Sequence, residues 1–136
     1  MKDNFVVVGV VKNKEGKILI VKRRKIEEGS DGSLLTWVFP GGRQKSGEKR
    51  EEALIREILE ETGYKIKPIR QISLRVHPQF LKIIVYYLCE LENEKQIQNP
   101  QEDEEIEEIK WVYPNELKNY FTTDIDPNGM KELGID

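Results

Sequence analysis

The segment G-R-Q-K-S-G-E-K-R-E-E-A-L-I-R-E-I-L-E-E-T-G-Y, residues 42–64, joins a glycine-containing lead-in to a predicted helix that is rich in glutamate. On a helical wheel of residues 48–62, the apolar side chains form one stripe, and Glu57, Glu60 and Glu61 gather on a different one. The apolar stripe consists of Leu54, Ile55, Ile58 and Leu59. This stripe is typical of a helix that packs on a core, which leaves the glutamates for another role.

A glutamate-rich helix is commonly a solvated face with salt bridges, but the positions of these glutamates favour a different interpretation. Glu57 precedes Glu60 and Glu61 by three and four residues, so their carboxylates are neighbours and repel by roughly 0.2–0.5 kcal/mol per pair. Gly63 is a natural end for the helix, and the helix dipole disfavours negative charge in the last turn by about 0.3–1 kcal/mol per group. A divalent cation bound by the carboxylates would turn this repulsion into attraction.

Oxygen ligands gathered on one face suit a hard ion such as Mg²⁺ or Mn²⁺. Such an ion keeps part of its water shell and takes its remaining ligands from substrate phosphates. It can activate a water molecule or bridge phosphate oxygens. The residues alone therefore predict a metal platform for phosphate chemistry.

The spacing of residues 42–64 also resembles the signature of the Nudix hydrolases, G-x5-E-x7-R-E-U-x-E-E-x-G-U, in which U is aliphatic. Every fixed position is matched in register, and only the last aliphatic position differs, because Tyr64 occupies it. The matching residues are Gly42, Glu48, Arg56, Glu57, Ile58, Glu60, Glu61 and Gly63. A pattern of this length is far more specific than a lone glycine motif.

The resemblance implies a role for each charged residue of the signature. Glu57, Glu60 and Glu61 are expected to be metal ligands, and Glu57 is also a candidate for orienting or deprotonating the attacking water. Arg56 is expected to pair with Glu48 and hold it in place, since such pairing fixes the geometry of a metal site. The general base varies in this family, so its assignment stays open.

Two further metal contacts are implied outside the helix. In the segment Pro40-Gly41-Gly42, the missing Cβ atoms let the backbone approach an ion or a phosphate, and the resemblance implies a carbonyl ligand from Gly42 or from Gly41. In the acidic run of residues 102–105, the resemblance points to Glu105, with Glu104 as the alternative. The other acids of this run are expected to be solvated.

Length and composition restrict the classes to which the protein can belong. The 136 residues are expected to form a single domain, residues 1–136, and 22 Lys and Arg against 25 Asp and Glu give a net charge of −3. This balance lacks the basic stripe of a protein that binds nucleic acid polymers. Cys89 is the one cysteine and lies in an apolar run, so a buried thiol is expected. Neither a membrane-spanning run nor a signal-peptide pattern is evident, which favours the cytoplasm.

The hydrophobic pattern predicts a mixed sheet with flanking helices. Residues 5–11 and 17–21 are expected to form a hairpin, residues 26–33 a polar loop, and residues 69–77 a half-exposed alternating strand. Further predicted elements are a short strand at residues 37–39, a central strand at residues 81–91 and a helix at residues 114–121. The resemblance implies the Nudix α/β/α sandwich, an α/β fold with a mixed central sheet and the signature helix on one face.

Candidate substrate contacts lie at four places. Arg23 is favoured within the basic cluster of residues 22–25, although a solvated strand end is an equal alternative. Trp37 is a candidate for base stacking, with core packing as the alternative. Arg75 is preferred to the neighbouring His77 for binding phosphate, because a guanidinium donates two parallel hydrogen bonds to phosphate oxygens. In the helix at residues 114–121, Asn119 is the favoured specificity residue, with its neighbours Tyr120 and Phe121 as further candidates.

The resemblance implies a Mg²⁺-dependent pyrophosphohydrolase, with Mn²⁺ as a substitute, of the MutT-like branch. This branch cleaves nucleoside triphosphates, ordinary or oxidised, to monophosphate and pyrophosphate. ADP-ribose and dinucleoside polyphosphates are alternative substrates, because the shape of the pocket rather than the signature sets the choice. A non-catalytic nucleotide sensor is an alternative of another class. The expected partner is a nucleotide-like small molecule, without nucleic acid polymer or membrane, and a homodimer is a further option.

Overall fold

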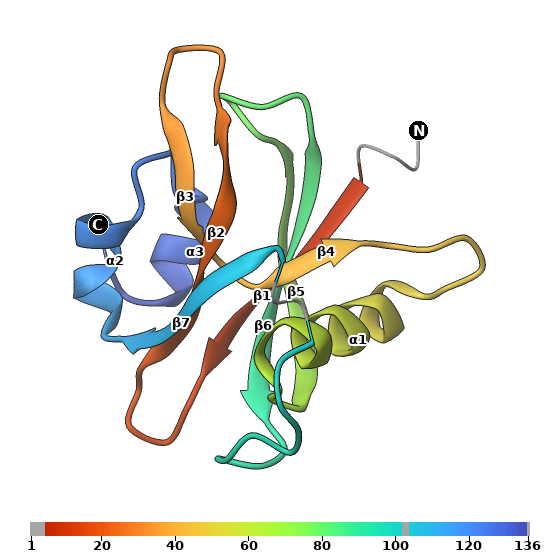
Figure 1. The fold of residues 1–136 in the computed structure, drawn as a ribbon. Coiled ribbons are helices and arrows are strands. Elements are labelled where there is room, and N and C mark those ends of the chain that lie inside the picture. The colour runs from red at the N-terminus through yellow and green to blue at the C-terminus, as the bar shows by residue number, and fades with distance from the viewer. Residues whose placement is uncertain (1–4, 102–103, 136) are drawn as a thin grey trace.

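The protein is described by a computed structural model that covers residues 5–101 and 104–135. A mixed sheet of seven strands forms its centre, and helices pack on both sides of it (Figure 1). The strands are β1 (Phe5–Lys12), β2 (Ile18–Glu28), β3 (Leu34–Val38), β4 (Gly41–Arg43), β5 (Ile66–Val76), β6 (Ile83–Leu91) and β7 (Ile106–Val112). The helices are α1 (Arg50–Thr62), the 3-10 turn η2 (Pro114–Glu116), α2 (Leu117–Tyr120) and α3 (Pro127–Glu132).

The sheet has the strand order β3-β2-β1-β6-β5, with β4 paired to β1 and β7 paired to β2. Strand β1 runs parallel to β6, and the other pairs are antiparallel. Strands β1 and β6 occupy the centre, as their continuous apolar sequences predict. The predicted α/β/α sandwich with a mixed central sheet is confirmed.

Each face of the sheet carries its own hydrophobic core. Helix α1 covers one face with Ala53, Leu54 and Ile58, which pack against buried side chains of β1 and β6. Helices α2 and α3 cover the opposite face, where Leu117 and Ile125 belong to a second buried cluster (Figure 1). Tyr86 and Tyr87 of β6 take part in different clusters, because successive side chains of a strand point to opposite faces.

Both ends of α1 are fixed by local contacts. At the start, the backbone N–H of Lys49 donates to Glu52 Oε1 at 2.9 Å. At the end, Gly63 adopts the left-handed conformation with φ of 78°, and its N–H donates to the carbonyl of Leu59 at 2.9 Å. A Cβ atom at Gly63 would lie 2.2 Å from the carbonyl oxygen of Gln98, so this helix end requires glycine. These contacts therefore fix the residues at which helix α1 begins and ends.

Strands β1 and β2 form the predicted hairpin, but the structure differs from the prediction in two details. The predicted hairpin of β1 and β2 is paired only at its closed end, at Lys12 and Ile18, because β4 takes the place beside the rest of β1. Strand β2 continues to Glu28, through residues that were predicted to be loop, because it pairs with β3 across an irregularity.

Near its C-terminal end, strand β5 buries polar side chains and exposes apolar ones, the reverse of the usual arrangement in a half-exposed strand. Leu74 and Val76 are 49% and 61% exposed, whereas Ser73 and His77 are 8% and 7% exposed. The polar side chains face inward because they have partners there: Ser73 Oγ donates to Asp126 Oδ1 at 3.1 Å. An irregularity in the pairing of β5 with β6, between Gln71 and Ser73, shifts the alternation at this point.

Cys89 is buried, and burial raises the pKa of its thiol to about 12. The prediction of a buried thiol is confirmed. Among the described residues, no helix has both the length and the apolar character needed to cross a membrane.

Candidate active site

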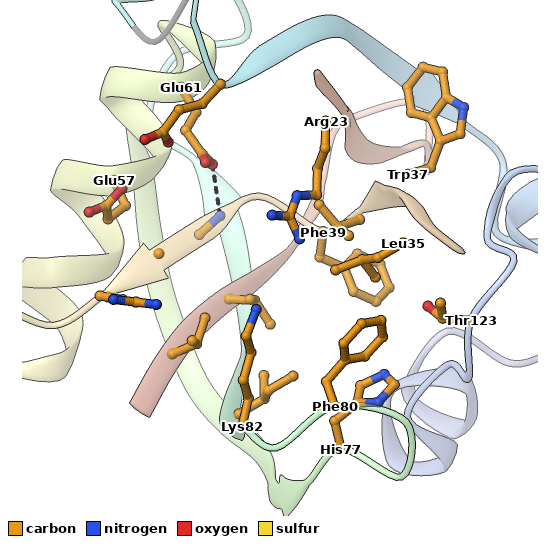
Figure 2. Close-up of a pocket in the computed structure, with 18 of the residues that line it drawn as sticks. Arg23, Leu35, Trp37, Phe39, Glu57, Glu61, His77, Phe80, Lys82 and Thr123 are labelled. Carbon is orange, nitrogen blue, oxygen red and sulfur yellow. Dashed lines mark hydrogen bonds between the residues drawn. The ribbon is translucent and has the colours of Figure 1, made fainter. Parts of the chain in front are cut away.

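A cavity of about 570 Å³ opens beside β4 and runs between the signature helix and the loops at the far end of the sheet (Figure 2). One end is lined by Glu57 and Glu61 of α1, and we call it the carboxylate end. The other end is lined mostly by apolar side chains, and we call it the aromatic end. Its residues are Leu35, Phe39, His77, Phe80, Phe121 and Thr123.

The glycine pair positions the two carboxylates of the carboxylate end. The backbone N–H of Gly41 donates to Glu61 Oε1 at 2.9 Å (Figure 2). A Cβ atom at Gly42 would lie 2.5 Å from Glu57 Cδ, so the Glu57 carboxylate fits against β4 only because residue 42 has no side chain. Strand β4 is itself held by its pairing with β1. The segment 41–42 and helix α1 thus form one packed unit.

Arg56 binds three glutamates of the signature. Its Nε and Nη2 donate to the two oxygens of Glu48, at 2.7 and 3.0 Å. Its Nη1 donates to Glu57 Oε1 at 2.9 Å and to Glu60 Oε2 at 3.3 Å. Arg56 therefore offsets part of the repulsion among the carboxylates, and it holds Glu57 directly as well as Glu48.

This network shifts two pKa values. The hydrogen bonds and charge of Arg56 lower the pKa of Glu48 from 4.5 to about 2, against a smaller opposing effect of burial. In return, the hydrogen bond to Glu48 and the neighbouring charge of Glu57 raise the pKa of Arg56 above its ordinary value. Both groups are fully ionised near neutral pH, so the pair is a fixed support for Glu57.

The aromatic end is built by three segments that are distant in the sequence. Phe39 and Phe121 meet edge to face, with ring centroids 4.9 Å apart. His77 and Phe80 form a similar contact at 5.2 Å on the other side (Figure 2). The His77 ring accepts the backbone N–H of Gln79 at Nδ1, and burial lowers its pKa, so the imidazole is neutral near pH 7. This end provides flat apolar surfaces of the kind that hold a planar ring.

Comparison with known proteins places this geometry in a family. A family model described as NUDIX domain matches residues 3–133. The chain belongs to the Nudix family.

Among relatives of this Nudix protein, the 8-oxo-dGTP diphosphatase of Buchnera aphidicola subsp. Schizaphis graminum is 32% identical over 121 residues, which cover 89% of this chain and 85% of that protein. Nudix hydrolase 6 of Arabidopsis thaliana is 33% identical over 113 residues, 81% of this chain, which spans 38% of that protein. Among solved structures, a MutT protein from Methanosarcina mazei Go1 has a TM-score of 0.68 at 20% identity, covering 96% of this chain and 91% of that one. This structural likeness shows the fold.

The oxygen atoms of the carboxylate end fit a hard divalent cation. Glu57 and Glu61 line the cavity together with Gly41 and Gly42, so a metal bound here would meet carboxylate and backbone carbonyl oxygens as its protein donors. Within residues 5–101 and 104–135, no three acidic, histidine or cysteine side chains are grouped closely enough to hold a metal by themselves. Such a site suits an ion that completes its shell with water and substrate phosphate. Glu60 does not line the cavity and instead accepts from Arg56.

The acidic run before β7 reaches the same cavity. Glu104 and Glu105 both line it, and the carbonyl of Glu105 accepts the N–H of Arg24 at 2.9 Å, which fixes this backbone beside β2. Both expected candidates are therefore placed at the cavity. Glu102 and Asp103 of the same run lie outside the described residues.

The candidate substrate contacts divide into two groups. Arg23 and Trp37 line the cavity, although Trp37 lies at its margin, edge to face with Tyr120 at 5.3 Å (Figure 2). Arg75 and Asn119 do not line it. Arg75 instead pairs with Asp124 at 2.6 Å and with Asp126 at 3.2 Å, and it is His77, the less favoured neighbour, that borders the cavity.

Sequence reasoning missed Lys82, Leu35, Phe39, Phe80 and Thr123 as cavity residues. Phe121 was named only as a secondary candidate. The available signal was an aromatic and a cation close together, Phe80 and Lys82, but a short turn segment does not show which way its side chains point.

Proposed function

We propose that this chain is a Mg²⁺-dependent pyrophosphohydrolase of the cytoplasm that cleaves a nucleoside triphosphate, ordinary or oxidised, to a nucleoside monophosphate and pyrophosphate. The observation that carries the proposal is a single cavity that joins Glu57 and Glu61 at one end to aromatic rings at the other. A nucleotide has the matching layout, with charged phosphates at one end and a flat base at the other. The name of the Buchnera relative, an 8-oxo-dGTP diphosphatase, agrees with this substrate class.

The residues of the carboxylate end would each have a defined task. Glu57, Glu61 and a carbonyl of the glycine pair would hold Mg²⁺, which supplies an activated water and neutralises phosphate oxygens. Glu57 would orient that water or accept its proton, a role supported by the contacts with Arg56 and Gly42 that fix its carboxylate. The water oxygen would form a bond to phosphorus in line with the anhydride P–O bond that breaks, which divides the triphosphate into a nucleoside monophosphate and pyrophosphate.

The aromatic end would bind the base. Phe39 and Phe80 offer ring faces or edges on two sides, and the Thr123 hydroxyl lies at the same end of the cavity (Figure 2). Base–aromatic stacking contributes about 1–3 kcal/mol per base in other nucleotide-binding proteins. Thr123 and the neutral His77 offer polar atoms that select among base edges.

The test is hydrolysis by the purified protein with Mg²⁺ and with Mn²⁺. The substrates are ordinary and oxidised nucleoside triphosphates, ADP-ribose and diadenosine polyphosphates, with products separated by chromatography. We expect a nucleoside monophosphate and pyrophosphate from a triphosphate. AMP from ADP-ribose alone would reject the triphosphate assignment, and absence of turnover throughout, with nucleotide binding retained, would favour a sensor.

A further inference from the structure

Two cations that line the cavity share one carboxylate oxygen. Lys82 Nζ lies 2.8 Å from Glu27 Oε1, and Arg23 Nη1 lies 3.2 Å from the same atom. Arg23 and Lys82 border the cavity, whereas Glu27 does not. The two positive groups therefore stand within two hydrogen-bond lengths of each other, at a spacing that one phosphate oxygen could also bridge.

These cations lie between the two ends of the cavity. Figure 2 shows the Arg23 guanidinium between the Glu61 contact and Phe39, and the Lys82 ammonium approaching from the side of Phe80. A nucleotide with its base at the aromatic end and its outer phosphates at the carboxylate end would place its first phosphate here.

The contact between Glu27 and Lys82 is not needed to hold these segments together. The turn at residues 77–82 is tied to the turn at residues 29–33 by Gln79, whose side chain donates to Asp31 at 2.8 Å and to Ser33 at 2.9 Å. The carbonyl of Gln79 also accepts the N–H of Ser30 at 2.8 Å. Because Gln79 already fixes the two turns, Glu27 is able to release its cations without opening the structure.

We propose that Lys82 and Arg23 form the binding site for the substrate phosphate nearest to the nucleoside, and that Glu27 is the internal counter-ion which this phosphate replaces. Before substrate binds, Glu27 keeps the two like charges close to each other. The phosphate nearest to the nucleoside carries about one negative charge on two terminal oxygens, so each cation can donate to an oxygen of its own, whereas both cations share Glu27 Oε1. Glu27 is thus a positioning residue, and it tunes phosphate affinity without touching the reacting atoms.

The charge state of Glu27 agrees with this role. Burial alone would raise its pKa, but the hydrogen bonds and charges of Lys82 and Arg23 outweigh that effect and lower it. Glu27 is therefore an anion near neutral pH. The side chains of Arg23, Lys82 and Glu27 are 27%, 26% and 36% exposed, so solvent weakens the ion pairs and makes exchange with an incoming anion easy.

This inference rests on the proposed function for the identity of the ligand, but its test uses inorganic phosphate alone, without metal or turnover. Isotope-labelled protein in EDTA at constant ionic strength is titrated with phosphate, while NMR follows the side-chain signals of Arg23 and Lys82. We expect saturable shifts of both. In Glu27→Gln, which keeps the shape but loses the charge, the dissociation constant for phosphate should fall about threefold, and in Lys82→Gln it should rise about threefold or more.

Lys65→Gln and Glu92→Gln are matched controls, because Lys65 and Glu92 form an exposed ion pair at 3.4 Å that takes no part in the cavity. Both should bind phosphate like the wild type, and thermal melts should show that all variants fold.

Weaker or unchanged phosphate binding by Glu27→Gln, or shifts at Lys82 that do not saturate, would overturn the inference. If the wild type hydrolyses triphosphates but phosphate does not bind at Arg23 and Lys82, the proposed function stands and this inference fails. If phosphate binds there but no substrate is hydrolysed, the proposed function fails instead.

Discussion

The two ends of the cavity differ in how far apart their parts lie in the sequence. The carboxylate end is made mainly by residues 41–61, and within this segment helix α1 and strand β4 hold the side chains of Glu57 and Glu61 in place. The aromatic end combines residues from β3, from the turn after β5 and from the segment before α3. The carboxylate end is therefore a local structure, whereas the aromatic end forms only after the whole sheet has folded.

If the carboxylate end performs the chemistry, the largest loss should follow from Glu61→Gln. The amide can still accept the N–H of Gly41 through its oxygen, so the fold should survive, but the negative charge at the cavity is lost. We expect kcat to fall about a thousandfold, matching the several kcal/mol that a metal contributes to such reactions. Steady-state kinetics with Mg²⁺ and a thermal melt measure both quantities.

Glu51→Gln is the matched control, since Glu51 is an exposed glutamate of the same helix. It should leave kcat and the melting temperature unchanged. The wild type should also melt at a higher temperature when Mg²⁺ is added, because an ion that binds only the native state stabilises it. An equal Mg²⁺ effect in Glu61→Gln would remove Glu61 from the metal site.

Gly42→Ala tests whether the glycine pair sets the position of Glu57. Its Cβ would lie 2.5 Å from Glu57 Cδ and must push the carboxylate aside. A displacement of about 1 Å is expected to lower kcat about 10- to 100-fold. Gly129→Ala is the control, because its Cβ would meet Asp126 at an ordinary 3.7 Å. Full activity of Gly42→Ala would show that the chemistry tolerates movement of Glu57.

The aromatic end should respond in a different kinetic constant. Phe80→Ala removes a nearly buried ring, 8% exposed, that borders the cavity beside His77. We expect KM for the preferred nucleotide to rise about tenfold, as the loss of one stacking surface predicts, with kcat changed much less. Steady-state kinetics on two nucleotides with different bases measure this effect. A drop in kcat with an unchanged KM would instead mean that Phe80 supports the chemistry.

The same contrast explains what the sequence could predict. The signature helix, its end at Gly63, the Arg56–Glu48 pairing and the approach of the glycine pair depend on spacings within residues 41–63, and the structure places them accordingly. Arg75 was expected at the phosphates, but it pairs with Asp124 and Asp126, which are about 50 residues away and leave no trace in the local pattern. Lys82 escaped notice for the same reason, since its partner Glu27 lay in a segment predicted to be loop.

The smallest expected effect concerns the pair that supports the carboxylate end. Glu48 has a pKa of about 2 in the folded protein against 4.5 as its ordinary value, so its pairing with Arg56 stabilises the native state fully above pH 4.5. This stabilisation is lost as the pH falls from about 4.5 toward 2. Glu48→Gln should therefore melt below the wild type at pH 7, and the difference should shrink across this acidic window.

Melting curves of both proteins from pH 7 to pH 2 measure that difference, because acid effects common to the two proteins cancel. The remaining carboxylate partners of Arg56, Glu57 and Glu60, stay in place, so turnover at pH 7 should fall only a few fold. A melting difference that is independent of pH would mean that Glu48 acts through packing rather than charge. In that case the support of the carboxylate end would resemble the aromatic end, where shape rather than ion pairing holds the residues.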